Sequence, residues 1–500
     1  MESHIDTSNT ADGEIREALA GILLKNEGNA TISVEIECEL KHGKDIRCCT
    51  EEPRQMNILD LNNDCLELIF VQFELKQLIA LAKTCTRFRA IAGNVIKRNK
   101  QNYSKWIYLP RPGYFGDFLE IFGNILEQLF VSYCGEINLI VMHCTNLKEL
   151  TVRHCIFNSI NFDQDSSLGF ESLEQLSIIW STISPHFIDR WKIPQKLQLL
   201  DLSYSHFPPG SLNVLKNLKF LNLRGSSVTD ECFSCLANNN PDLEYLNISD
   251  CNQLSAKSIQ CIVKYMTKLS YLSWSSRYSE EPYESSTERQ KIVQLPLLKK
   301  LVIKDYNYGG GEIDYLLRSL AKSDQLEQLE LKNQKIDDFG LICNLSNLKV
   351  FKYVYSGLSM ENFELAKLCD KENFIEVHIS GRDVSEKQLL KFISKNPKLE
   401  QLHVRNFHIR RKDFILSVLK TLKRQSNNQE GVNAGLQKKR LKINVQYISI
   451  PNDTIQNLLA GCDHLLKLSC FGYDCSSDEC SVSDEDERAY ASYNNYDSSE

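Results

Sequence analysis

Two kinds of segment are missing from this 500-residue sequence: a membrane span and a secretory signal. A transmembrane helix needs about 20 consecutive apolar residues, and no uncharged apolar stretch here approaches that length. The first residues, Met1 to Asp6, lack the basic and apolar segments of a signal peptide. We therefore expect no membrane partner, and an intracellular protein of the cytoplasm, the nucleus or both. Its 18 cysteines are expected to be reduced.

Most of the chain also has little net charge of either sign. The formal charge is −7, but residues 471–500 hold nine acidic residues against Arg488 alone, which amounts to −8. Residues 1–470 therefore carry a net charge of +1. Proteins that bind nucleic acids through their backbone usually show a strong basic excess, so no nucleic-acid partner is expected.

Signatures of catalysis and metal binding are absent as well. The sequence has no phosphate-binding loop, dinucleotide-binding glycine motif, zinc-protease motif or nucleophile elbow. Cys232 and Cys235 form a CxxC pair, but no second pair stands at a distance typical of a zinc site, which favours simple packing. We predict no catalytic residue, no metal site and no cofactor, and hence a protein that is not itself an enzyme.

What the sequence has instead is a repeat. From Leu243 it reads Leu-Glu-Tyr-Leu-Asn-Ile-Ser-Asp-Cys-Asn-Gln-Leu, which fits the template L-x-x-L-x-L-x-x-(C/N/S)-x-L. With other apolar residues allowed at the L positions, the template starts again at Leu126, Leu147, Leu173, Leu197, Leu218, Leu269, Leu298, Leu326, Leu348, Phe374 and Leu399. Starts 21 to 29 residues apart are typical of leucine-rich repeats. The spacing predicts a curved α/β solenoid over residues 105–470, with parallel strands inside and helices outside.

Cysteines at three positions support this prediction. Cys134, Cys155 and Cys251 occupy the C/N/S position of the template, where a small side chain turns inward after the strand. A free thiol packs there as a small apolar group. The two ends of the chain differ from the repeats, since residues 1–52 are polar and irregular and 471–500 are acidic, and both are expected to be disordered.

Residues 56–100 predict a small helical domain. Asn63 or Asp64 is a suitable helix cap, and Leu66, Ile69 and Phe70 then share one helical face. A second apolar helix follows from Leu75. A segment this short cannot bury so many apolar side chains by itself, so part of the surface is expected to await a partner.

This segment resembles an F-box, whose pattern is roughly L-P-x-E-(L/I)-(L/I)-x-x-I-F followed by D-L-x-x-(L/A)-x-x-V-C-(R/K)-x-(W/F). Two departures matter: Asn62 stands at the usual proline, and Phe88 replaces the commoner tryptophan. The resemblance implies an all-helical domain that docks on the Skp adaptor, and through it on a cullin. The residues it assigns to the adaptor site are Leu61, Leu66, Ile69, Phe70, Leu75, Leu78, Leu81, Cys85 and Phe88.

With the repeats behind it, the whole segment from 56 to about 470 resembles an F-box and leucine-rich-repeat protein. That resemblance implies the substrate receptor of an SCF (Skp–cullin–F-box) ubiquitin ligase, in which the repeats hold an unknown target protein. The alternative is a leucine-rich-repeat scaffold or inhibitor that binds a partner without ubiquitin transfer.

The repeat also predicts which side chains a target would meet. Alternation along a strand sends the L positions into the core and the residues between them to the concave face. The third template position then gives a row of large apolar side chains on adjacent strands, Leu199, Phe220, Tyr245 and Tyr271. This row is either a contact site or a strip that stacks on itself or lies beneath a polar insertion at 275–294.

Later repeats give a basic half of the same face. Its side chains are Lys300, Lys304, Lys332, Lys352, His378, His403 and Arg405, interrupted by Glu330 and Glu376. Lys304, Lys332 and Lys352 are candidate contacts for an acidic or phosphorylated target segment. The other interpretation is a solvated face of mixed charge.

Overall fold

A computed structural model describes most of the chain from residue 56 to residue 470. The described residues are 33–34, 56–99, 105–106, 113–135, 137–157, 168–169, 171–185, 191–192, 194–208, 210–276, 290–305, 312–354, 365–368, 372–380, 384–429 and 440–470. The segments expected to be disordered, 1–52 and 471–500, lie outside this set except for Ser33–Val34. Residues 277–289 of the polar insertion lie outside it too.

The chain forms two compact units, and the first comprises residues 1–176 and 189–196. Its N-terminal part holds the antiparallel pair β1 (Ser33–Val34) and β2 (Met56–Asn57), the turn η1 (Ile58–Asp60), and the helices α2 (Asn63–Phe70), α3 (Leu75–Thr84) and α4 (Thr86–Arg98). The following elements are β3 (Lys105–Trp106), α6 (Phe115–Phe122), η2 (Gly123–Ile125), β4 (Gln128–Ser132), α7 (Ile137–His143), β5 (Glu149–Arg153), β6 (Ile156–Phe157), β7 (Leu168–Gly169) and β10 (Trp191–Lys192). Strands β3, β4 and β5 pair in parallel, as do β7 and β10.

The second unit, residues 177–188 and 197–500, is built on a parallel sheet. Strand β8 (Gln175–Ile179) reaches into it and β9 (Thr182–Ile183) follows; after these, each strand pairs with the next in chain order. Those strands are β11 (Leu199–Asp201), β12 (Phe220–Asn222), β13 (Tyr245–Ile248), β14 (Tyr271–Ser276), β15 (Lys300–Asp305), β16 (Gln328–Lys332), β17 (Val350–Val354), β18 (Glu376–Ser380), β19 (Gln401–Ile409), β20 (Leu441–Ile448) and β21 (Leu466–Cys470).

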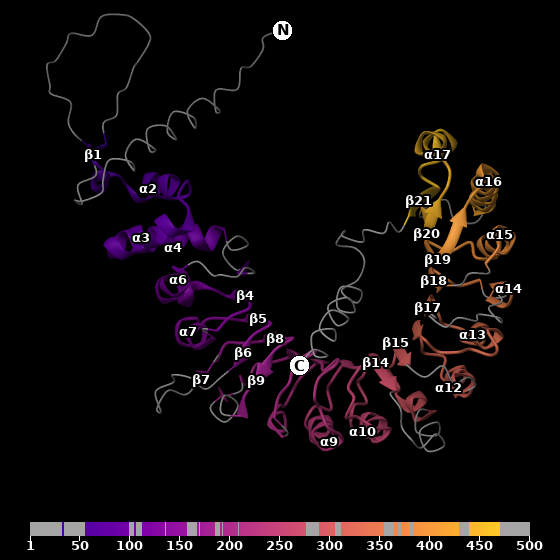
Figure 1. The fold of residues 1–500 in the computed structure, drawn as a ribbon, viewed down its shortest axis with the longest axis horizontal. Helices are drawn as coiled ribbons and strands as arrows, with labels where there is room; N and C mark the ends of the chain where they lie inside the picture. The colour runs from indigo at the N-terminus through magenta and orange to yellow at the C-terminus, as the bar shows by residue number, and fades with distance from the viewer. Residues whose placement is uncertain are drawn as a thin grey trace, which may run out of the picture. The chain divides into compact units, whose positions relative to one another are not determined.

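Helices connect these strands and lie on one side of the sheet (Figure 1). They are α9 (Asp230–Asn239), α10 (Lys257–Tyr265), η3 (Lys291–Gln294), α12 (Glu312–Leu320), α13 (Gly340–Cys343), α14 (Leu365–Leu368), α15 (Glu386–Lys395), α16 (Lys412–Gln429) and α17 (Asn452–Leu459). Among the described residues these helices cover one side of the sheet, and strand residues form its other side. In the part of the chain that the structure describes, no helix is long and apolar enough to cross a membrane.

The repeat template matches the strands position by position. In the repeat that begins at Leu243, strand β13 starts two residues later, and Leu243, Leu246 and Ile248 are buried. The same offset holds from β4, two residues after Leu126, to β19, two residues after Leu399. The predicted α/β architecture of parallel strands and outer helices is therefore confirmed.

The template cysteines are buried, as predicted, and they also carry hydrogen bonds. Cys134 N donates to the Sγ of Cys155, one repeat further on, at 2.8 Å. In the second unit the Cys251 thiol donates to Leu223 O at 2.8 Å. Burial raises the pKa of Cys251 to about 12, so the group stays a neutral thiol. These cysteines therefore link successive repeats through hydrogen bonds to backbone groups of the turn.

The residue before the C/N/S position of the template turns the chain in the left-handed region. Its φ is positive at Tyr133, His154, Tyr204, Gly225 and Asp250. At Gly225 a Cβ atom would lie 2.4 Å from Cδ1 of Tyr204, so the ring of one repeat occupies the space beside the glycine of the next. A side chain at this position would meet both an unfavourable φ and a close contact.

Candidate protein-binding surfaces

Helix α2 begins one residue earlier than expected. Asn62, not Asn63 or Asp64, is the cap, because its side chain accepts a hydrogen bond from Cys65 N at 2.8 Å. Asn62 stands where the F-box pattern has proline. Both residues suit a helix start, proline through its fixed φ and asparagine by accepting a backbone N–H. The departure from the pattern therefore keeps the helix boundary.

The largest apolar side chains of the F-box pattern form a core within the chain. Leu66, Phe70 and Leu78 have no exposed surface, and Phe88 packs edge-on against Phe70 with ring centroids 5.3 Å apart. These four residues are among those that the resemblance assigns to the adaptor site, and within this chain they have almost no surface left for direct contact. Their burial follows from α2 and α3 both packing against α4.

A helix beyond the pattern supplies the rest of this core. Helix α6 packs on α3 and α4 and buries Phe115, Phe118, Leu119 and Phe122. An ion pair from Lys83 Nζ to Asp117 Oδ2, 2.7 Å long, joins α3 to α6 at the surface. The apolar side chains that seemed to require a partner are therefore buried largely by the chain's own helices.

Two polar residues of the pattern have structural roles. Arg87 donates from Nε to Asn63 Oδ1 at 2.9 Å and from Nη1 to Leu59 O at 2.8 Å. It also donates to Leu61 O. Cys85 caps α4, accepting a hydrogen bond from Phe88 N on its Sγ at 3.4 Å. Arg87 therefore holds the segment before α2 against the start of α4, and Cys85 fixes where α4 begins.

One accessible apolar strip follows a side of α2. Leu68 is 73% exposed and Val71 is 46% exposed, and together with exposed Cys65 they stand three residues apart. We call Cys65, Leu68 and Val71 the α2 stripe. Among the residues assigned to the adaptor by resemblance, Cys85 is exposed and the half-buried ones are Leu61, Ile69, Leu75 and Leu81. Sequence reasoning missed Leu68 and Val71 because the F-box pattern does not specify them.

The predicted apolar row exists on the strand side of the second unit. Leu199, Phe220, Tyr245 and Tyr271 pair directly across adjacent parallel strands, and all four are half-buried. The rings of Phe220 and Tyr245 stack with centroids 3.9 Å apart, and those of Tyr245 and Tyr271 at 4.0 Å. The row therefore stacks on itself and still presents part of its surface. We call these four residues the aromatic row.

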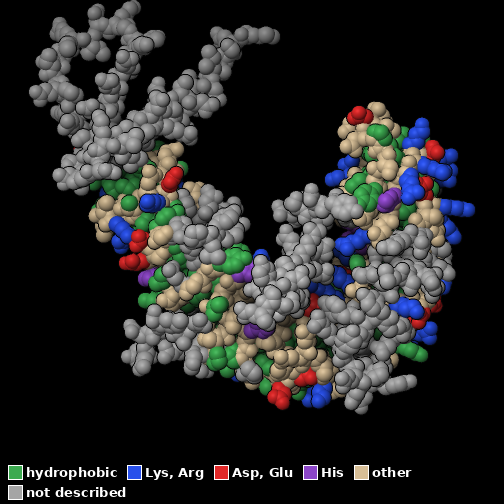
Figure 2. Space-filling view, in the orientation of Figure 1, with side chains coloured by type: hydrophobic (Ala, Val, Ile, Leu, Met, Phe, Trp, Pro, Cys, Tyr) green, Lys and Arg blue, Asp and Glu red, His purple; other side chains and the backbone are tan. Residues whose placement is uncertain are grey.

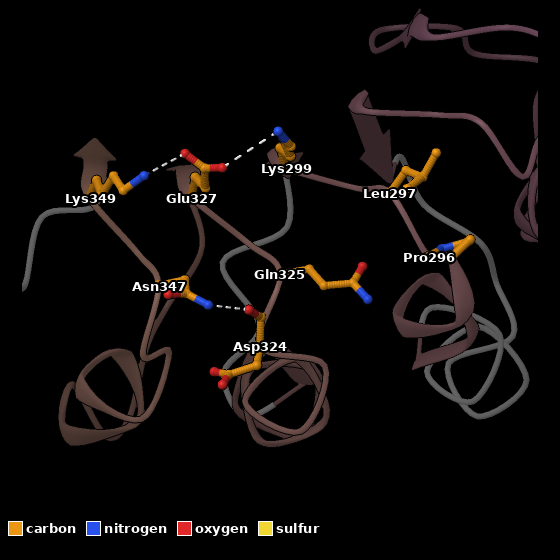
Figure 3. A pocket seen from close by; sticks show the side chains of 8 residues that line it. All are labelled: Pro296, Leu297, Lys299, Asp324, Gln325, Glu327, Asn347 and Lys349. Carbon is orange, nitrogen blue, oxygen red and sulfur yellow. Dashed lines mark hydrogen bonds and ion pairs between the residues drawn. The ribbon is translucent and has the colours of Figure 1, made fainter.

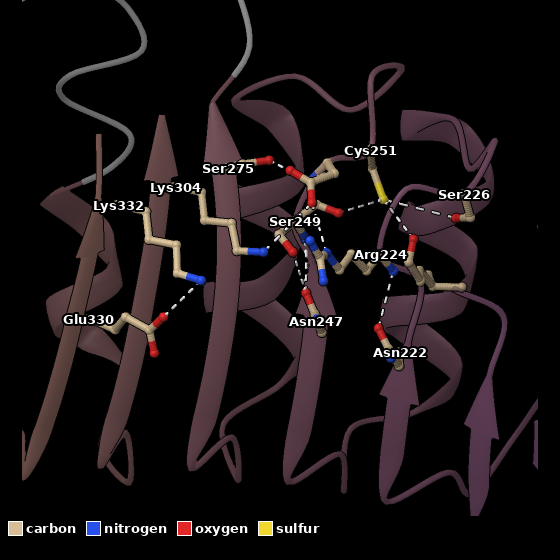
Figure 4. A network of polar contacts seen from close by, with 12 residues as sticks. Asn222, Arg224, Ser226, Asn247, Ser249, Cys251, Ser275, Lys304, Glu330 and Lys332 are labelled. Carbon is tan, nitrogen blue, oxygen red and sulfur yellow. Dashed lines mark hydrogen bonds and ion pairs between the residues drawn. The ribbon is translucent and has the colours of Figure 1, made fainter. Parts of the chain in front are cut away.

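Three of the predicted basic side chains, Lys304, Lys332 and Lys352, each lie near a carboxylate, and Figure 4 shows the first two. Asp250 accepts from Arg224 Nε at 2.8 Å and lies 3.6 Å from Lys304 Nζ. The next two pairs are Lys332 with Glu330 at 3.3 Å and Lys352 with Glu376 at 2.8 Å. Burial lowers the pKa of Lys304 to about 8, against the opposing effect of Asp250. Sequence reasoning missed Arg224, although it occupies the same template position as Lys304.

The two histidines of this half carry little charge at neutral pH. Their rings stack with centroids 3.8 Å apart. Burial lowers the pKa of His378, and it lowers the pKa of His403 to about 3. Hydrogen bonds from His378 and Lys352 hold the pKa of Glu376 down at about 2. The positive charge of the face therefore comes from Lys and Arg. On the visible surface as a whole, Lys and Arg side chains of both sides gather towards the C-terminal elements of the unit (Figure 2).

A shallow pocket at the start of β15 to β17 carries no reactive group (Figure 3). Glu327 bridges two lysines there, Lys349 at 2.8 Å and Lys299 at 3.7 Å, and all three occupy the same template position in successive repeats. These two ion pairs join the three successive repeats at the start of their strands. The CxxC pair is likewise unsuited to a shared ligand, since Cys232 is buried and Cys235 exposed. Within the described residues no cluster of His, Cys, Asp and Glu could hold a metal ion.

Comparison with known families identifies the helical segment. Residues 58–100 match the F-box domain, so the chain contains an F-box. No curated protein sequence matches the chain significantly.

Solved leucine-rich-repeat structures resemble the chain in fold. One is a crystal structure of an internalin (inlF) from Listeria monocytogenes str. 4b F2365, which is 17% identical with a TM-score of 0.40. That match covers 71% of this chain and 89% of the internalin. Another is the TLR13–ssRNA13 complex, 17% identical with a TM-score of 0.39. It covers 70% of this chain, which spans 54% of the TLR13 chain.

Proposed function

We propose that this F-box and leucine-rich-repeat protein is the substrate-recognition subunit of an SCF ubiquitin ligase. The observation that carries the proposal is the F-box at residues 58–100, followed in the same chain by a leucine-rich-repeat sheet. F-box domains generally bind the Skp adaptor, and a one-sided sheet suits capture of a protein. In this proposal a separate ubiquitin-conjugating enzyme performs the chemistry, in agreement with the absence of catalytic motifs from the sequence.

The adaptor docks, in this proposal, on the α2 stripe together with the half-buried Leu61, Ile69, Leu75 and Leu81. Exposed aliphatic side chains placed along one helix are a common docking element. The buried Leu66, Phe70, Leu78 and Phe88 support that surface from beneath. Loss of any of them would weaken adaptor binding indirectly, by loosening the helices.

Pull-down with purified Skp adaptor tests the docking surface. The double variant Leu68→Asp/Val71→Asp places two charges in the proposed contact, where their desolvation opposes binding. We expect adaptor capture to fall by at least about 100-fold, while the circular dichroism spectrum stays unchanged. Asn94→Asp, on an exposed position of α4, adds the same kind of charge elsewhere and should bind normally. Full capture by the double variant would reject the α2 stripe.

The target binds, in this proposal, across the aromatic row and the neighbouring Lys304, Lys332 and Lys352. Large aromatic side chains on a rigid platform often carry much of an interface's energy. The triple variant Phe220→Ala/Tyr245→Ala/Tyr271→Ala should keep adaptor binding and lose the proteins ubiquitinated by the reconstituted ligase. Retention of the same ubiquitinated proteins would place the target elsewhere on the chain.

One observation favours the alternative, a repeat scaffold or inhibitor without ubiquitin transfer. The F-box core is closed by the chain's own α6, so the domain does not need an adaptor to bury its apolar residues. Co-purification from cells separates the two. A ligase subunit brings down Skp adaptor and cullin, whereas a scaffold with a non-binding F-box brings down its partner alone.

A further inference from the structure

The aromatic row ends in a cation rather than in another ring. Tyr271 pairs across the sheet with Lys300 of β15, whose Nζ lies 5.1 Å from the centroid of the Tyr271 ring. Four template positions further along, Arg224 and Lys304 both pair with Asp250, and Lys332 pairs with Glu330 (Figure 4). The apolar and basic halves, which the sequence presents as separate, are thus one continuous surface on β12 to β16.

Stacking decides which part of each ring a ligand can meet. The ring faces are turned towards one another at 3.9 and 4.0 Å, in the direction that runs from strand to strand. The ring edges therefore point away from the sheet. Aromatic edges carry partial positive charge, so they favour the face of another ring, or an anion, over a cation.

The charged cluster also favours an anionic ligand. Its members named above are three cations and two carboxylates, and both Arg224 and Lys304 are largely buried. A carboxylate brought to this surface gains more from such partly desolvated cations than from lysines in open solvent. Because burial disfavours the charged form of Lys304, a further anion would also relieve that cost.

We infer that the strand face of β12 to β16 selects a peptide segment in which an acidic side chain stands close to an aromatic one. The aromatic side chain packs on the ring edges of Tyr245 and Tyr271, and the carboxylate reaches Lys300 and Lys304. This inference rests on the proposed function, because it names the target chemistry of that same surface. Single-stranded nucleic acid fits poorly, since bases stack on free ring faces and the faces of Tyr245 and its neighbours are occupied by one another.

Selection from a displayed library of random peptides tests this chemistry. The full chain is the bait, both alone and together with Skp adaptor. We expect the selected peptides to carry Asp or Glu within a few residues of Phe, Tyr or Trp. Enrichment of basic peptides, of apolar peptides without acids, or of none would overturn the inference.

Variants assign the two preferences to residues. Lys300→Gln/Lys304→Gln should weaken a selected peptide by about tenfold and remove the preference for acids when the selection is repeated. Tyr245→Ala/Tyr271→Ala should remove the preference for aromatic residues. Two exposed residues on helices serve as matched controls, Lys391→Gln on α15 and Tyr315→Ala on α12, and both should bind like the original chain. Equal binding by all four variants would overturn the assignment.

The adaptor separates failure of this inference from failure of the proposed function. Acidic and aromatic selection by a chain that never binds adaptor would support the surface chemistry and reject the ligase role. Adaptor binding with no such selection would do the reverse. A chain ending at Cys470 provides a further readout, because residues 471–500 hold nine acids together with Tyr490, Tyr493 and Tyr496. Tighter peptide binding after their removal would identify this segment as a competitor of the same chemistry and support the inference.

Discussion

The F-box helices and the repeat strands both bury leucines, but they differ in which side chains are left exposed. In the repeats, burying Leu221, Leu246 and Leu272 leaves their neighbours Phe220, Tyr245 and Tyr271 side by side on the opposite side of the sheet. In the F-box, burying Leu66 and Phe70 leaves Leu68 and Val71 outside, residues that the family pattern does not mention. The same rule of apolar burial therefore exposes a predictable surface in one region and an unpredicted one in the other.

Periodicity explains the difference. A strand alternates strictly between two sides, so a template that marks the core also marks the exposed face. A helix repeats every 3.6 residues, and a short amphipathic helix offers several apolar directions. Which direction meets the rest of the chain depends on helices that are distant in the sequence, here α4 and α6.

The largest expected effect comes from comparing alanine substitutions at a buried and an exposed leucine of α2. Leu66→Ala empties a fully buried position and should cost about 2–5 kcal/mol of local stability. Leu68→Ala, on the exposed side, should change it by less than about 0.5 kcal/mol. Hydrogen exchange of the α2 and α4 amides measures both. Similar protection in the two variants would erase the distinction between core and α2 stripe.

A smaller effect tests how neighbouring repeats fit together. Gly225→Ala combines a φ of +65° with a close contact to the Tyr204 ring, and should destabilise the second unit by about 1–3 kcal/mol in urea unfolding. Gly461 also has a positive φ, +74°, but nothing lies near its Cβ position. Gly461→Ala therefore measures the backbone cost alone. An equal loss of unfolding free energy in the two variants would show that the Tyr204 ring moves aside at no cost.

The smallest expected effect is a pH dependence on the strand face. The folded-state pKa of Lys304 is lowered to about 8 from 10.5, so between these values the unfolded chain binds more protons. Stability therefore rises with pH through this window, by about 1 kcal/mol between pH 7 and pH 9. Lys304→Met should lack this rise, which parallel urea titrations at the two pH values measure. The same rise in the variant would assign it to another group.

The adaptor and target surfaces differ in how far the sequence predicted them. The template start at Leu243 predicted where β13 begins and which side chains it buries, and the row Phe220, Tyr245 and Tyr271 followed from alternation. The adaptor residues came from a family pattern, which does not distinguish core from surface. Four of the nine, Leu66, Phe70, Leu78 and Phe88, proved to be core.

By itself, the sequence determined the repeat spacing, the strand starts, the inward cysteines and the presence of an F-box, because each depends on residues close together in the chain. Only the tertiary structure decided that the aromatic rings stack face to face, that Arg224 and Lys304 share Asp250, and that α6 closes the F-box core. Those contacts join residues from separate repeats or helices. Their partners are chosen by side-chain packing and charge across the fold, which a local pattern does not record.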